Sequence, residues 1–70
     1  MKIVLNGAWR EIAPADPADA TLEAVLMSLG FGHAVVATAL NGQFVPGGAR
    51  VEVKVRDGDR VEVLAPMQGG

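Results

Sequence analysis

The sequence predicts an α+β fold, in which one helix packs on one face of a mixed sheet. Three observations lead to this prediction. Two Asn-Gly pairs, at residues 6–7 and 41–42, each follow a strand-like segment and mark tight hairpin turns. Residues 22–29 carry apolar side chains at helical spacing. Residues 60–64 alternate between charged and apolar side chains, which is the pattern of a half-buried strand.

The N-terminal segment predicts a β-hairpin. Residues 2–6 are mostly apolar and β-branched, and they run directly into Asn6-Gly7. Asparagine and glycine both tolerate the positive φ angles that a two-residue turn requires. The return strand is then expected from Ala8 to Ile12. Pro14 and Pro17 cannot continue a ladder of hydrogen bonds, so the stretch that contains them is predicted to be a connecting loop.

One helix of about ten residues is predicted after this loop. Thr21 is placed to act as the N-cap, and Glu23 puts negative charge in the first turn, where the helix dipole favours it. Gly30 suits the left-handed residue that ends a helix, and Phe31 can fold back on the last turn. The apolar stripe that would face the sheet consists of Leu22, Val25, Leu26 and Leu29.

The second half of the chain predicts further strands. Residues 34–40 and 43–45 flank the second Asn-Gly turn, and Pro46-Gly47-Gly48 then breaks the chain. Residues 51–55 alternate valine with charged residues and predict a half-buried strand. A turn at 57–59 leads into the strand at 60–64.

These elements correspond to the β-grasp arrangement, a mixed sheet of four to five strands with one main helix on one face. Residues 1–66 would form the domain. Residues 67–70 would form a flexible tail, since nothing in Met67-Gln68-Gly69-Gly70 continues a strand.

Composition and charge exclude several classes of function. The chain of 70 residues contains no cysteine, so thiol nucleophiles, zinc fingers and iron–sulfur ligation are ruled out, and a reducing, cytoplasmic location is expected. His33 is the one histidine and is expected to be a solvated loop residue, so no metal site is predicted. A net charge of −2, with basic residues spread along the chain, argues against nucleic acid. No apolar run is long enough to span a membrane. We therefore expect protein partners.

Several segments together resemble the ThiS family, the sulfur carrier proteins of thiamin biosynthesis, which are ubiquitin-like β-grasp proteins. The resemblance extends over nearly the whole chain, and a terminal Gly-Gly after a Gly-Asp-Arg-Val-Glu-Val strand is its most specific part. The segment after Val45-Pro46 departs from the family pattern, because many members have a Ser- and Trp-containing stretch there. The matching segments are residues 2–7, Thr21, residues 40–42, Val45-Pro46, residues 57–63 and residues 68–70.

The resemblance implies a carrier that is acted on by enzymes and is not itself an enzyme. An adenylating enzyme of the ThiF type would use ATP and magnesium to activate the carboxylate of Gly70. A persulfide would then supply sulfur, leaving Gly70 as a thiocarboxylate. A thiazole synthase of the ThiG type would take that sulfur for the thiazole ring of thiamin. The chain itself would bind no cofactor.

The residue types of the tail fit this chemistry. Glycine has no Cβ, so Gly69 and Gly70 can thread a channel that side chains would block, with Gln68 just behind them. A carboxylate is a poor electrophile until it is joined to AMP, whereas an acyl-adenylate is a mixed anhydride that a sulfur nucleophile can attack. The alternative is that the two glycines are a frayed end without function.

A docking surface is also predicted on the face of the sheet opposite the helix. If Ile3, Leu5, Val61 and Val63 face the helix, alternation places the residues between them on the open face. A register error would instead bury some of these residues. Trp9 would lie opposite Val4, where it could join the surface or cover the sheet edge. The residues predicted to contact partners are Val4, Ala37, Ala39, Leu64 and Met67.

Three alternative functions remain open from the sequence alone. The chain also resembles the small subunit of molybdopterin synthase, another sulfur carrier that ends in Gly-Gly. It could be a ubiquitin-like binding module with an inert tail. Its sulfur could also feed another pathway, such as tRNA thiolation. Asp57 and Asp59 flank Gly58, so a role in forming a turn explains them better than acid–base catalysis.

Overall fold

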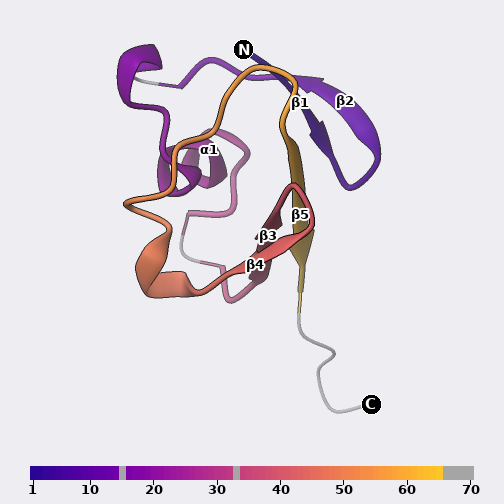
Figure 1. Cartoon of the computed structure of the whole chain (residues 1–70), viewed down its shortest axis with the longest axis vertical. Helices are drawn as coiled ribbons and strands as arrows, with labels where there is room; N and C mark the ends of the chain where they lie inside the picture. Colours follow the sequence, from indigo (N-terminus) through magenta and orange to yellow (C-terminus); the bar gives the residue numbers. More distant parts are fainter. Residues whose placement is uncertain (15, 33, 66–70) are drawn as a thin grey trace.

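The computed structural model describes residues 1–14, 16–32 and 34–65. Within them, five strands form one mixed sheet in the order β2-β1-β5-β3-β4, and the α-helix lies against one face of it (Figure 1). The predicted α+β arrangement is confirmed. No helix in this part of the chain combines the length and the apolar character needed to cross a membrane. The elements are β1 (Lys2–Leu5), β2 (Ala8–Glu11), α1 (Leu22–Ser28), β3 (Ala37–Leu40), β4 (Gln43–Val45) and β5 (Arg60–Leu64), with 3-10 turns at Pro17–Asp19 and Gly47–Ala49.

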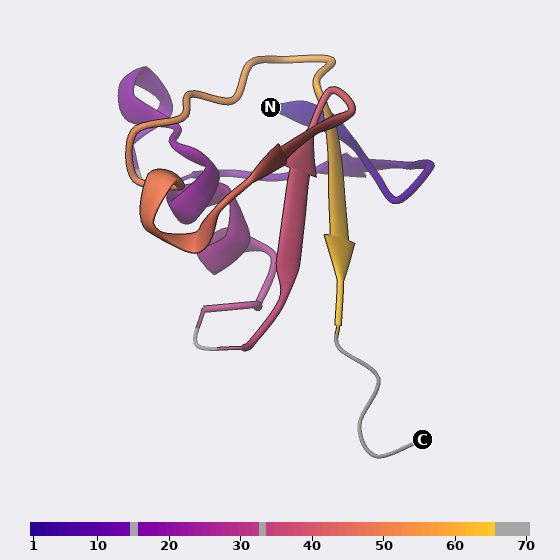
Figure 2. The same cartoon turned by 60° about the horizontal axis from the view of Figure 1, so that its bottom comes forward.

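Strand β5 occupies the centre of the sheet. It runs parallel to β1, with Val4 beside Arg60, and antiparallel to β3, with Ala37 opposite Leu64. The two hairpins β1–β2 and β3–β4 therefore flank β5 on its two sides, as Figure 2 shows. The last strand in the sequence is thus the one to which the rest of the sheet is attached.

The hairpin turns form as predicted. Asn6 has φ 49° and Gly7 has φ 86°, while Asn41 and Gly42 have φ 51° and 84°. Positive φ at both central residues matches the right-handed twist of the flanking strands. Two strands are shorter than predicted at the ends that lie away from these turns. β2 ends at Glu11 rather than Ile12, and β3 begins at Ala37 rather than at residue 34.

Both predicted ends of the helix are confirmed. The Thr21 Oγ1 accepts a hydrogen bond from the Ala24 N–H at 3.1 Å. At the other end Gly30 has φ +92°, and the N–H of Phe31 donates to the carbonyl of Leu26 at 2.9 Å. Because Leu29 is already the C-cap, the helix has 7 residues and is shorter than the predicted ten.

The core lies between α1 and the inner face of the sheet. The alternation predicted along β1 and β5 is confirmed, since Ile3 and Val61 are fully buried. Leu22 and Val25 of α1 are also fully buried. The buried apolar cluster as a whole consists of Ile3, Leu5, Ile12, Leu22, Val25, Leu26, Val45, Val55, Val61 and Val63.

The predicted strand at residues 51–55 is wrong. The chain turns at the start of this segment, where the Glu52 N–H donates to the Ala49 carbonyl at 3.0 Å. It then runs beside the N-terminus of α1, with a single bridge between Lys54 and Thr21. Both sides of β5 are already occupied by β1 and β3, so the sheet has no place beside β5 for this segment. Of its three alternating valines, Val55 is buried and Val53 packs against the core, while Val51 remains exposed.

A buried polar network joins this connection to the sheet. Thr38 on β3 is only 2% exposed, and its hydroxyl donates to the Val45 carbonyl at 2.9 Å. The Arg50 Nε donates to the same hydroxyl oxygen at 2.9 Å, and Arg50 Nη2 donates to the Val36 carbonyl at 2.6 Å. Arg50, in the segment where the chain departs from the family pattern, thus ties β3 to the turn after β4.

Thr38→Val is therefore expected to destabilise the fold even though it changes the side-chain volume little. The substitution removes the partner of both the Val45 carbonyl and the Arg50 Nε. Leaving buried polar groups unpaired costs about 1–3 kcal/mol in the free energy of unfolding. Urea denaturation measures this as a lower midpoint at an unchanged slope. A midpoint equal to that of the unmodified chain would show that the network contributes nothing to stability.

Candidate functional site

The structure describes the base of the predicted tail. Strand β5 ends at Leu64, and Ala65 follows it as an exposed residue. Met67, Gln68, Gly69 and Gly70 lie outside the described residues, as do His33 and the boundary predicted at residue 66. The predictions made for these residues therefore stay predictions, and the described part of the site is the surface around Leu64 and Ala65.

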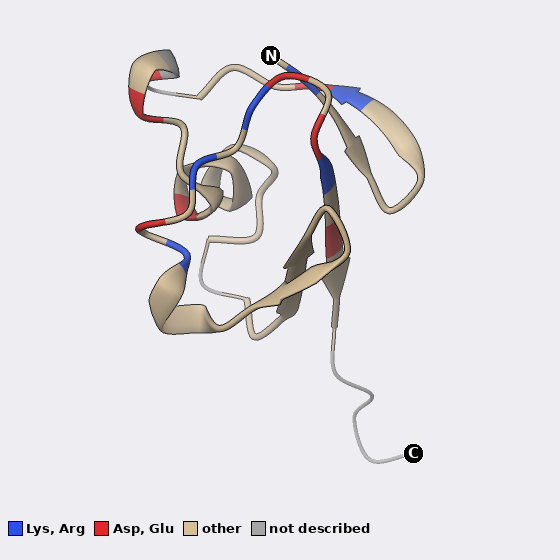
Figure 3. Cartoon of the chain, viewed as in Figure 1, with Lys and Arg blue, Asp and Glu red and all other residues tan. Residues whose placement is uncertain are grey.

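Among the described residues, the end of the molecule at which β5 stops carries few charged side chains. No Lys, Arg, Asp or Glu occurs between Glu23 and Arg50, and none occurs after Glu62. Residues 24–49 include β3 and β4, which lie beside the end of β5. Figure 3 shows the consequence: blue and red segments lie along the N-terminal half of β5 and the loops around α1, while β3 and β4 are tan. A partner that surrounds the exit of the tail therefore meets a surface that is poor in charge, where Glu62 lies beside Leu64 and Arg50 binds the Val36 carbonyl.

Apolar side chains gather on the open face at this end. Ala37 lies opposite Leu64, and Ala39 lies opposite Phe44. Leu64 is 68% exposed and Phe44 is 70% exposed. We call these four residues the outer patch: Ala37, Ala39, Phe44 and Leu64.

Two shallow hollows accompany the outer patch. Its four residues, with Thr38 and Glu62, line one of about 100 Å³. The second hollow, of about 340 Å³, lies between the segment leading into β3 and the residues that end β5. It is lined by Val35, Val36, Ala37, Leu64 and Ala65. Both hollows thus lie beside the exit of the chain.

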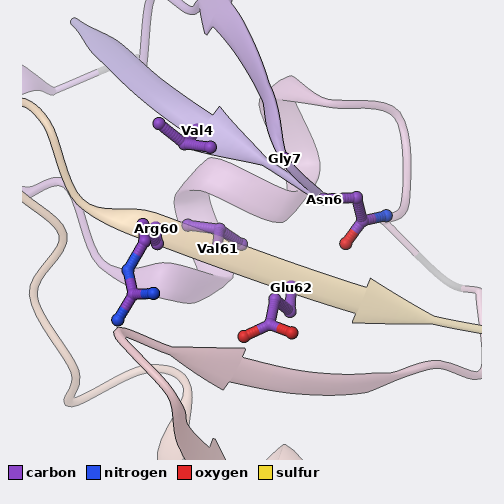
Figure 4. Close-up of a pocket in the computed structure, with 6 residues that line it drawn as sticks. All are labelled: Val4, Asn6, Gly7, Arg60, Val61 and Glu62. Carbon is purple, nitrogen blue, oxygen red and sulfur yellow. The ribbon is translucent and has the colours of Figure 1, made fainter.

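The predicted docking residues that the structure describes share the open face of the sheet but are not all neighbours. Ala37, Ala39 and Leu64 lie together, but Val4 lies on the other side of β5, opposite Trp9. Arg60 and Glu62 project from β5 between the two groups, and Figure 4 shows them with Val4. Trp9 is 67% exposed, so its ring covers little of the sheet edge. Met67 lies outside the described residues.

Phe44 and Val35 were not among the predicted docking residues. Phe44 could have been found from the sequence, because a two-residue turn at Asn41-Gly42 fixes its position opposite Ala39. Val35 is 80% exposed and lies before β3 begins, so no strand periodicity indicates where it points.

The side chain of Asn6 binds the end of β5. Its Oδ1 accepts the Val63 N–H at 2.8 Å, and its Nδ2 donates to the Val63 carbonyl at 3.1 Å. Figure 4 shows Asn6 beyond the end of β1, beside the second half of β5. A hollow of about 250 Å³ opens between β1 and β5 on the open face, and Val4, Asn6 and Gly7 line its β1 side.

Asn41 binds the start of β5 in a comparable way. Its N–H donates to the Arg60 carbonyl at 2.8 Å, and its Oδ1 accepts the Arg60 N–H at 2.9 Å. Its Nδ2 donates to Asp59 Oδ1 at 3.2 Å. We call the two side chains the asparagine clamps. The sequence predicted both residues only as turn formers; an amide, which both donates and accepts, was the available signal for this second role.

The remaining polar candidates are structural. Asp57 Oδ1 accepts the Lys2 N–H at 2.7 Å, and Asp59 Oδ2 accepts the Arg56 N–H at 2.8 Å, which confirms their role in the turn. Gly58 between them has φ 86°. Among the residues that the structure describes, no three His, Asp or Glu side chains converge in a way that could hold a metal ion.

Known proteins resemble this chain over its whole length. The crystal structure of a thiamine biosynthesis protein (ThiS) from Geobacter metallireducens is similar with a TM-score of 0.79 and 32% sequence identity, and the match covers 100% of both chains. A thiazole synthase from Paramagnetospirillum magneticum is 39% identical over 70 residues. That match covers 100% of this chain but 20% of the synthase, so the chain spans about a fifth of the length of this relative.

The model of the ThiS family matches residues 3–70. The matched range begins in β1, includes every strand and the helix, and reaches Gly70. With the similarity of the whole fold to a solved ThiS protein, this establishes that the chain belongs to the ThiS family.

Proposed function

We propose that this chain is a sulfur carrier of thiamin biosynthesis, which holds sulfur as a thiocarboxylate on Gly70. The observation that carries the proposal is the family match that runs through Gly69 and Gly70. The geometry at the base of the tail supports it. The central strand leads the chain out of the sheet at an end that is poor in charge, where mostly apolar side chains would meet a partner.

The proposed chemistry takes place in the active sites of partner enzymes. A ThiF-type enzyme, using ATP and magnesium, joins the Gly70 carboxylate to AMP and releases pyrophosphate. The outer sulfur of a persulfide then displaces AMP and forms an acyl disulfide with Gly70. A second thiol of the sulfur-donating enzyme cleaves the S–S bond of this adduct, becomes part of a disulfide, and leaves Gly70 as the thiocarboxylate. The chain contributes an end without side chains and binds no cofactor of its own, so it acts as a co-substrate.

The proposed acceptor of the sulfur is a ThiG-type thiazole synthase. In the relative from Paramagnetospirillum magneticum, a segment similar to this whole chain belongs to the same polypeptide as the rest of a thiazole synthase. Joining two modules in one chain makes their encounter intramolecular and raises their effective concentration. That arrangement supports the same pairing between this chain and a separate synthase.

The outer patch is the proposed contact with both enzymes. Exposed apolar surface on a small protein marks a contact site more often than chance placement does. Leu64 stands directly before the tail, so a partner that receives the tail also covers this residue. A few well-packed residues near the centre of an interface contribute most of the binding energy, and Phe44 and Leu64 are the two large side chains of the outer patch that could be buried in this way.

Incubation of the chain with the adenylating enzyme, ATP, magnesium and a persulfide source is expected to replace one oxygen by one sulfur at Gly70. Intact-mass and fragment-mass spectrometry measure this exchange. Gly69→Val is expected to slow the exchange at least about tenfold, because a branched side chain blocks the channel, while the melting temperature stays unchanged. An unmodified mass in the presence of every cognate enzyme would exclude the carrier function.

Deletion of Gly69 and Gly70 separates the carrier from a binding module. A carrier folds normally without them and loses all sulfur transfer, whereas a module with an inert tail keeps its activity. The acceptor is tested by supplying the thiocarboxylate form to a thiazole synthase or to a molybdopterin synthase large subunit. Transfer to the second enzyme alone would contradict the thiamin assignment.

The double substitution Phe44→Ser, Leu64→Ser is expected to raise the KM of the adenylating enzyme for the carrier about tenfold, through the loss of two apolar contacts. The free energy of unfolding is expected to change by less than about 1 kcal/mol, because both side chains are exposed. Trp9→Ser is the matched control, since Trp9 is as exposed as Leu64 but lies outside the outer patch. An equal rise in KM for this control would refute the proposal that the outer patch contacts the adenylating enzyme.

A further inference from the structure

We infer that Asn6 is a positioning residue for sulfur transfer: its side chain fixes the end of β5 and thereby the point at which the tail leaves the domain. This inference rests on the proposed function and adds a residue to it. Asn6 is not one of the four residues of the outer patch. It acts through Val63, which lies two residues before Ala65.

The hydrogen bonds between β1 and β5 show what the side chain replaces. The Val4 N–H donates to the Asp59 carbonyl at 2.9 Å, and the Asn6 N–H donates to the Val61 carbonyl at 3.0 Å. In a regular parallel ladder, the next two hydrogen bonds on this side of β5 would join main-chain groups of the neighbouring strand to the N–H and the carbonyl of Val63. The chain instead turns at Asn6-Gly7, and main-chain pairing of β1 with β5 ends at Leu5 and Val61.

The side-chain amide of Asn6 makes the two hydrogen bonds to Val63 that main-chain groups of β1 would make if the ladder continued. Its Oδ1 accepts a hydrogen bond from the Val63 N–H at 2.8 Å, and its Nδ2 donates one to the Val63 carbonyl at 3.1 Å. Both polar groups of Val63 on this side of β5 are therefore paired although β1 has ended. An aspartate carboxylate could accept the Val63 N–H but could not donate to the Val63 carbonyl, and a serine would have to make both hydrogen bonds through one oxygen on a shorter side chain.

The position of this contact connects it to the tail. β5 is held on its other side by β3, where Leu64 pairs with Ala37. Without the Asn6 side chain, the last residues of β5 would be bound on one side only, and the strand would fray toward Val61. A partner that receives the tail would then have to order these residues as it binds, which lowers affinity. The chemistry at Gly70 would proceed unchanged once the tail is seated.

The test compares Asn6→Gly with the matched control Asn41→Gly. Glycine tolerates the positive φ of both turns, so each substitution removes a clamp and keeps its hairpin. Asn41 binds the start of β5, at Arg60, so its loss leaves the end of the strand paired. Both variants are expected to lose stability, and all measurements are made where both are fully folded.

Asn6→Gly is expected to accelerate exchange of the Val63 amide hydrogen about tenfold and to raise the KM of the adenylating enzyme for the carrier by a similar factor. Its kcat is expected to stay within about twofold of the unmodified chain. Asn41→Gly is expected to leave both the Val63 exchange and the KM unchanged. Asn6→Asp, which keeps the acceptor for the Val63 N–H, is expected to give intermediate values.

Equal increases in KM for both glycine variants would reduce Asn6 to a structural residue and overturn the inference. An unchanged Val63 exchange in Asn6→Gly would overturn it as well, and this measurement needs no partner enzyme. Failure of the unmodified chain to become a thiocarboxylate would instead refute the proposed function. In that case faster exchange at Val63 in Asn6→Gly would still establish the clamp.

Discussion

The structure depends on satisfying the backbone of β5 on both sides although its neighbours are short. The N–H and carbonyl groups of a central strand must be paired, because leaving them unpaired costs as much as a lost hydrogen bond. β1 reaches only as far as Val61 and β3 turns at Asn41, so side-chain amides complete the two ladders. Two hairpin turns and one central strand are thereby made interdependent by the same two asparagines.

Most of the fold followed from local rules. Both Asn-Gly turns, the Thr21 cap, the Gly30 end of the helix and the alternation of β5 are set by residues close together in the sequence, and the structure confirms them. The prediction of a strand at residues 51–55 failed because alternating side chains indicate that a segment has an apolar and a polar face but do not indicate which strand lies beside it. Whether a place beside β5 exists depends on the pairing of β1 and β3, which involves distant parts of the chain.

The candidate site was predictable to a smaller extent. The register of the hairpins placed Ala37, Ala39 and Leu64 on the open face, but alternation along each strand could not reveal that β5 separates Val4 from them. The contact between Asn6 and the end of β5 could not be predicted from local sequence patterns either, because its partner Val63 lies 57 positions away in the sequence. Contacts of this kind become visible only when the order of the strands is known.

The scarcity of charge at the end of β5 affects how partners are recognised. Dissolved ions screen contacts between exposed charges, and oppositely charged surfaces accelerate encounter over a Debye length of about 8–10 Å. The residues around the end of β5 offer little of either effect, since the charges described close to it are those of Glu62 and of Arg50, which is bound to the Val36 carbonyl. Complexes formed through this end would have affinities nearly independent of ionic strength, and selectivity among competing proteins would come from complementary shape.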